Sequence, residues 1–106
     1  MGINRNEAAE QLFRAILSLE NVDECFAFFE DAFTIRELQE ISQRYEVAEK
    51  LWQGKSYNDI NKETGASTAT ICRVKKCLTS DDSGYALVLD RLNTQEVYRN
   101  EKSEKA

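Results

Sequence analysis

The chain has 106 residues, of which 42% are hydrophobic and 31% charged, and its formal net charge is −5. This length fits one domain with a modest core. No apolar run approaches the roughly 18 residues needed to cross a bilayer, and the polar N-terminus is unlike a signal peptide. We therefore expect one domain over residues 1–106, located in the cytoplasm and without a membrane partner.

Cysteine and histidine usage argues against catalysis. The sequence contains three cysteines and no histidine, so the commonest general base and a frequent metal ligand are missing. An odd number of cysteines without a C-x-x-C pair also disfavours a disulfide framework or a zinc site. We predict no catalytic residue, no metal and no cofactor, and therefore no enzyme. The thiols of Cys25, Cys72 and Cys77 are expected to be reduced and buried or half-buried.

The first two predicted helices come from apolar residues at three- and four-residue steps. One helix is predicted over residues 6–19, with Asn6 as its N-cap. Asn21 or Asp23 caps a second helix, which ends near Phe33 and is apolar around most of its circumference. Apolar residues around most of a helix indicate that a second subunit buries it. The alternative is a central core helix within one subunit.

Three further stretches complete an all-α prediction. Thr34 and Glu37 form a candidate capping box for a helix of about 19 residues that stops at Gly54. A last helix is expected from Tyr85 to about Arg99, followed by a frayed tail over about residues 100–106. The sequence has no proline and no strand-like alternation. With the two helices between residues 56 and 78, the prediction is about six helices.

Residues 56–78, SYNDINKETGASTATICRVKKCL, predict two short helices joined by a turn. Ser56 caps the first helix, Gly65 follows its end, and Ser67 caps a second helix that runs from Thr68 to about Leu78. A Gly-containing turn between two short helices, the second carrying small polar and then basic residues, is typical of a helix-turn-helix. We predict that this second helix reads DNA.

The distribution of charge supports that location. Residues 55–79 carry five basic and two acidic side chains, a net charge of +3, whereas residues 1–54 sum to −6 and residues 80–106 to −2. Phosphate contacts depend on charge within about a Debye length, so a local basic face matters more than the total. Lys75 and Lys76 are expected to contact DNA, with a merely solvated face as the alternative.

From Phe33 to Leu78 the sequence resembles the bacterial Trp repressor family, in particular its YerC/YecD-type branch. The resemblance rests on T-G-A-S-T-A-T-I-C-R and on the preceding E-V-A-E-K-L-x-x-G. It implies an intertwined homodimer that binds a palindromic operator in double-stranded DNA and regulates transcription as a repressor. The DNA contacts implied by matching positions or expected from chemistry are Asn58, Asn61, Ser67, Thr68, Ala69, Thr70, Cys72, Arg73, Lys75 and Lys76.

The resemblance also implies an effector site for a small corepressor. The family binds tryptophan through a threonine and two arginines, and the matching positions here are Thr34, Arg44 and Arg73. Arginine can hold a carboxylate bidentately. The family has glycine where this chain has Val74, and a β-branched side chain there partly fills an indole pocket, which argues against tryptophan. Each residue also has a structural reading: Thr34 as an N-cap, Arg44 paired along its own helix, and Val74 in the core.

A second function is compatible with the same sequence. The acidic flanks on both sides of residues 55–79 are unusual for a DNA-binding protein. A helical dimeric protein-interaction module that keeps the helix-turn-helix without reading DNA is therefore the alternative.

Overall fold

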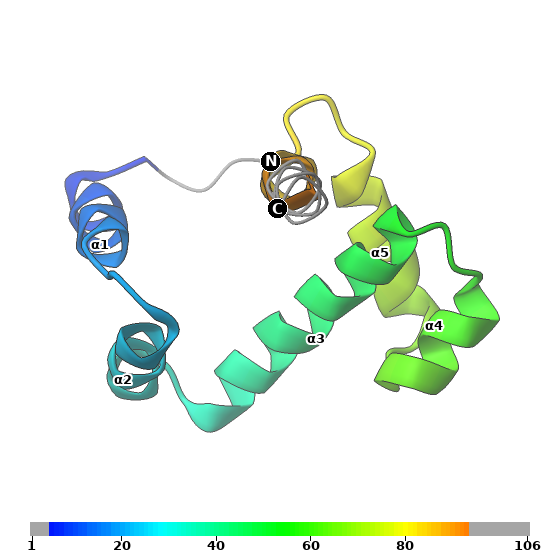
Figure 1. The fold of residues 1–106 in the computed structure, drawn as a ribbon, viewed down its shortest axis with the longest axis horizontal. Coiled ribbons are helices and arrows are strands. Elements are labelled where there is room, and N and C mark those ends of the chain that lie inside the picture. Colours follow the sequence, from blue (N-terminus) through cyan, green and yellow to red (C-terminus); the bar gives the residue numbers. More distant parts are fainter. Residues whose placement is uncertain (1–4, 94–106) are drawn as a thin grey trace, which may run out of the picture. The chain divides into compact units, whose positions relative to one another are not determined.

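The structure, a computed structural model, describes residues 5–93. It consists of five helices, α1 (Glu7–Leu17), α2 (Val22–Ala32), α3 (Ile35–Trp52), α4 (Tyr57–Thr64) and α5 (Thr68–Leu78) (Figure 1). A sixth helical segment begins at residue 84 and continues through residue 93. No strand occurs within residues 5–93, which confirms the all-α prediction. The expected helix end near Arg99 and the tail over residues 100–106 lie outside the described residues.

Short polar side chains begin the first two helices as predicted. The Asn6 side chain accepts a hydrogen bond from the Ala9 amide at 2.8 Å. Asn21, not Asp23, caps the second helix, and its side chain accepts from the Glu24 amide at 2.9 Å. These bonds satisfy amides that have no partner inside a helix.

The end of α1 was predicted two residues too late. The helix stops at Leu17, because the Ser18 backbone amide and hydroxyl both donate to the Ala15 carbonyl, at 3.1 and 2.6 Å. A serine hydroxyl that competes for a helical carbonyl favours termination there.

The described residues divide into two compact units, with the boundary between Leu38 and Gln39. In the first unit, α1 and α2 contain no buried residue. Leu17 is 83% exposed and Phe26 57% exposed, although both are large apolar side chains. Among the described residues, α2 therefore contributes nothing to a buried core, contrary to the alternative of a central core helix.

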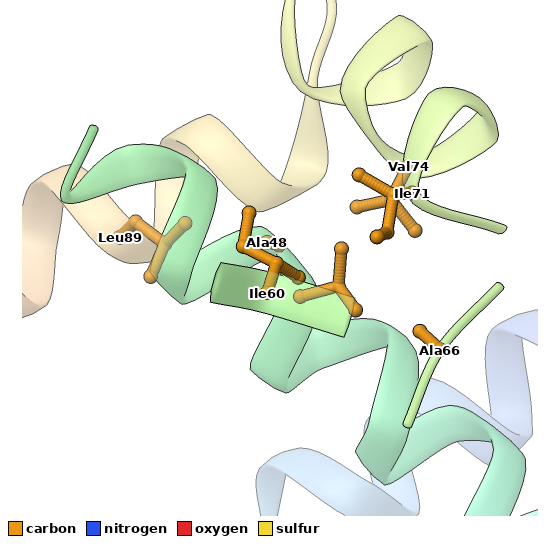
Figure 2. Close-up of a cluster of buried hydrophobic side chains, with 7 residues drawn as sticks. Ala48, Ile60, Ala66, Ile71, Val74 and Leu89 are labelled. Atoms are coloured by element: carbon orange, nitrogen blue, oxygen red, sulfur yellow. The ribbon is translucent and has the colours of Figure 1, made fainter. Parts of the chain in front are cut away.

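The second unit contains all of the buried hydrophobic core found in the described residues. Figure 2 shows side chains from the second half of α3, α4, α5 and the segment at residues 84–93 that meet in one cluster. The cluster comprises Val47, Ala48, Ile60, Ala66, Ile71, Val74 and Leu89. Val74 is 2% exposed, in agreement with its structural reading. This packing fixes one face of α5 against the unit and leaves the opposite face in solvent.

Candidate nucleic-acid interface

The turn between α4 and α5 has the backbone that glycine allows. Gly65 has φ of 74°, in the left-handed region, and its amide donates to the Asn61 carbonyl at 2.9 Å. A residue with a Cβ atom is disfavoured in this conformation, so glycine ends α4 with a sharp change of direction. Ser67 then caps α5 by accepting from the Thr70 amide at 3.2 Å. The predicted helix-turn-helix is therefore present.

Three polar side chains hold this turn in place. The Asn61 side-chain amide donates to the Ala66 carbonyl at 2.7 Å. The Thr64 hydroxyl donates to the Ile60 carbonyl at 2.7 Å and accepts from the Ala66 amide at 3.1 Å. From α3, the Gln43 side-chain amide donates to the Thr64 carbonyl at 3.2 Å. Asn61, predicted to contact DNA, thus also has a structural role in fixing the approach to α5.

The outward face of α5 carries four of the ten predicted DNA contacts. Ile71 and Val74 point into the core, and the residues on the opposite side follow i, i+3, i+4 and i+7 spacing, which places them in one stripe. We call this exposed set the reading stripe; it consists of Ala69, Cys72, Arg73 and Lys76. A small residue, a thiol and two cations along one helix face can enter a groove and meet both base edges and phosphates.

The remaining predicted DNA contacts flank the reading stripe. Thr68 is exposed beside it, and Asn58 is exposed on α4. The Lys75 ammonium lies 5.5 Å from the centre of the Tyr57 ring, so the Lys75 side chain extends back over α4. The Ser67 hydroxyl donates to the Thr70 hydroxyl at 3.1 Å, and Thr70 is half-buried on the side of α5 that faces α3.

Two of the lysines near the helix-turn-helix are paired with an acidic side chain. The Lys55 ammonium lies 2.9 and 3.1 Å from the two Glu63 carboxylate oxygens, and the Lys50 ammonium lies 3.2 Å from one of them. Hydrogen bonds from Lys55 and then from Lys50 hold the pKa of the Glu63 carboxyl below its ordinary value. Within residues 5–93, Arg73, Lys75 and Lys76 have no carboxylate within 4.0 Å. Among the described residues, the acidic side chain of Glu63 thus pairs with Lys50 and Lys55 and not with the cations of α5.

A cavity between α3 and α5 brings together two of the predicted effector residues. It has a volume of about 250 Å³ and is lined by Glu40, Gln43, Arg44, Thr70 and Arg73. This volume is below the roughly 300–1,000 Å³ of most small-molecule sites, and the lining contains no aromatic or aliphatic residue. Neither Arg44 nor Arg73 pairs with a carboxylate in the described part of the chain. The arrangement suits a small anionic group better than an indole ring.

The third predicted effector residue, Thr34, does not line this cavity. Its hydroxyl accepts from the Glu37 amide at 3.1 Å, and its own amide donates to the Glu37 carboxylate at 2.9 Å. The two groups form the predicted capping box of α3. The backbone hydrogen bond from Thr34, followed by that of its side chain, lowers the pKa of the Glu37 carboxyl.

The prediction for the cysteines was wrong. Cys25, Cys72 and Cys77 are free, as expected, but all three are exposed. Cys72 and Cys77 lie off the face of α5 that carries Ile71 and Val74, and Cys25 belongs to a helix without buried residues. In residues 5–93 no group of three histidine, cysteine or acidic side chains is arranged to hold a metal ion. No helix of this range is long and apolar enough to span a membrane.

Gln43 is the functional candidate that the sequence did not reveal. Its hydrogen bond to Thr64 joins residues 21 positions apart, so neither helical periodicity nor a capping motif predicts it. The same side chain lines the cavity next to Arg44.

Together these features define an all-α protein with a helix-turn-helix whose second helix presents small and basic side chains to solvent. The model of the family described as Trp repressor protein matches residues 7–93. The chain therefore belongs to the Trp repressor family, which confirms the predicted resemblance.

Similar proteins agree with this assignment. The chain is 47% identical over 98 residues to the uncharacterized protein YerC of Bacillus subtilis strain 168, covering 92% of this chain and 94% of that protein. A crystal structure of a TrpR-like protein from Eubacterium eligens ATCC 27750 is 50% identical, with a TM-score of 0.80 over 84% of this chain and 92% of that one. A proposed Trp repressor from Staphylococcus aureus is 49% identical, with a TM-score of 0.79 and coverage of 84% and 89%. Membership of this family indicates a DNA-binding regulator rather than an enzyme.

Proposed function

We propose that the protein is a sequence-specific transcriptional regulator that binds double-stranded DNA as a homodimer and reads it with α5. The observation that carries the proposal is the reading stripe. Ala69, Cys72, Arg73 and Lys76 are exposed on the face of α5 opposite Ile71 and Val74, so DNA contact requires no rearrangement of the core.

The charges of the second unit support this choice over the interaction module. The acidic excess lies in residues 1–54 and 80–106, whereas the exposed side of α5 carries Arg73 and Lys76 without an acidic partner in the described residues. Binding to phosphates depends on such local, unpaired cations. Because the rest of the chain is negatively charged, we expect its non-specific affinity for DNA to be modest. High affinity should then require that α5 docks correctly on the DNA.

The first unit supports the homodimer. Large apolar side chains of α1 and α2 are exposed in one chain, among them Phe13 at 48%, Leu17 at 83% and Phe26 at 57%. Exposed apolar area of this kind is typical of a surface that a partner covers. A symmetric dimer places two reading helices about one DNA turn apart, which matches a palindromic operator.

The proposal is tested with purified protein and DNA. Selection of bound genomic fragments gives the operator, and fluorescence anisotropy over a series of salt concentrations then measures the number of phosphate contacts. Lys76→Ala should lower the slope of log affinity against log salt by about one, because one phosphate contact is lost. Thr68→Ala should alter base preference and leave the slope unchanged.

Lys55→Ala serves as the matched control, since it removes one positive charge that is already paired with Glu63. Its salt slope should equal that of the unmodified protein. If the unmodified protein enriches no DNA even at low salt, the protein-interaction module is the better assignment.

The cavity between α3 and α5 supports a narrower proposal about control. With Arg44 and Arg73 in its wall and no aromatic or aliphatic residue in its lining, it favours a small anionic corepressor over tryptophan. Val74 is 2% exposed and occupies the core directly after Arg73. Calorimetric titration with tryptophan should therefore give no binding heat, and operator affinity should not change on its addition. A tryptophan-dependent gain in affinity would contradict this.

A further inference from the structure

Gln43 lies at a junction between the cavity and the turn that precedes α5. Its side chain is half-buried on α3 and donates to the carbonyl of Thr64, the last residue of α4. Carbonyls in the last turn of a helix have no partner inside that helix, so a side-chain donor satisfies a specific need there. Because a carbonyl oxygen only accepts, the Gln43 amide must present its nitrogen to this position.

The contact continues from Thr64 to Ala66, two residues before the start of α5. The Thr64 hydroxyl accepts from the Ala66 amide at 3.1 Å, and the Ala66 carbonyl accepts from the Asn61 side chain at 2.7 Å. Ala66 is 1% exposed, so it cannot move freely within the core. The next residue, Ser67, is the N-cap of α5. A displacement of Thr64 therefore changes where α5 begins and how its reading stripe is directed.

Gln43 also forms part of the cavity wall, together with Arg44 on its own helix and Thr70 and Arg73 on α5. A glutamine amide has a second N–H donor and a carbonyl acceptor beyond the one donor used on Thr64. A group that occupies the cavity therefore lies beside the side chain that holds the turn.

We propose that Gln43 is the positioning residue that couples the α3–α5 cavity to the orientation of the reading helix. It acts through Thr64 and contacts no DNA itself. This inference rests on the proposed function, because its consequence is the selectivity of DNA binding.

The test compares the full-length protein with Gln43→Met, which keeps the length of the side chain and removes both the donor and the acceptor. Affinity is measured for the selected operator and for a random duplex at the same salt concentration. The ratio of the two affinities should fall about fivefold to tenfold, the change typical of one lost hydrogen bond. The salt slope on random DNA should stay unchanged, because every cation remains.

The ratio separates positioning from stability. A variant that merely unfolds more readily loses affinity for both duplexes by the same factor, so its ratio stays constant. Gln39→Met is the control, since Gln39 lies one turn earlier on α3, is exposed and does not line the cavity. Its affinity ratio should match that of the unmodified protein.

Coupling to the cavity is tested by a double-mutant cycle with Arg44→Met, which alters the cavity wall without altering a group in the turn. The combined effect on the affinity ratio should differ from the product of the single effects. If Gln43→Met keeps the ratio, or if the two changes combine independently, the inference is overturned while the DNA-binding function stands. If the unmodified protein binds no DNA, the proposed function fails first, and this inference fails with it.

Discussion

The two units of the chain use apolar residues in opposite ways. In the second unit, residues from four helical segments form one cluster in which Val47, Ala48, Ile60 and Ile71 are fully buried. In the first unit, α1 and α2 have comparable apolar residues but bury none of them. One chain therefore buries a core behind α5 in the second unit, whereas among the described residues α1 and α2 keep their apolar side chains exposed.

The largest expected effect comes from the core of the second unit. Ile60→Ala should lower the free energy of unfolding by about 2–5 kcal/mol, because Ile60 is 0% exposed and its removal leaves a cavity. Urea denaturation measures this loss. The graded control Ile60→Val should cost about 0.5–1.5 kcal/mol. Equal stabilities for Ile60→Ala, Ile60→Val and the unmodified protein would mean that this cluster does not stabilise the second unit.

A smaller effect is expected for a substitution in the first unit. It should weaken the association of two subunits into the proposed dimer. Phe26→Ala removes a large apolar side chain that is 57% exposed in one chain. If a second subunit covers it, the dimer should weaken by at least about 2 kcal/mol, as for a central interface residue. Sedimentation velocity over a range of protein concentrations measures the shift.

Asp31→Ala on the same helix is the control for this comparison, since it removes an exposed charged side chain and no apolar area. It should leave association unchanged. A Phe26→Ala protein that remains as dimeric as the unmodified one would show that α2 is not at the interface.

The smallest effect concerns the surface pairing around Glu63. Its folded-state pKa is lowered by Lys55 and Lys50, so its ionised form stabilises the fold above the pKa of the unfolded state. That contribution is lost as pH falls through the lowered folded-state pKa. Glu63→Gln should therefore melt slightly below the unmodified protein at pH 7, and the difference should shrink as pH falls through the folded-state pKa of Glu63. Thermal melting over a series of pH values measures it, and a difference that grows in acid would contradict the assignment.

Local signals explain how much of the fold could be predicted. The N-caps at Asn6, Ser56 and Ser67 and the left-handed Gly65 depend on residues within a few positions, and the structure has each of them. The end of α1 was misplaced because a hydroxyl at Ser18 competes with continued helix, a balance that periodicity does not capture.

Contacts between distant residues explain what could not be predicted. The Gln43–Thr64 bond and the pairing of Glu63 with Lys50 depend on how α3 and α4 pack. Whether a cysteine is buried depends on which face of its helix packs against other helices. Residue type alone predicted burial, but all three cysteines are exposed. Arg44 and Arg73 were predicted as one site by family resemblance, and the cavity brings them together without Thr34.

The separation of faces on α5 has a consequence for how such a regulator can change its target. Ile71 and Val74 maintain the fold, while Ala69, Cys72, Arg73 and Lys76 contribute nothing to the buried cluster. Exposed substitutions away from caps and cores usually alter stability by less than about 0.5 kcal/mol. Under the proposed function, substitutions at Ala69, Cys72 and Lys76 can therefore change the operator without redesign of the interior, whereas Arg73 is constrained by the cavity that it also lines.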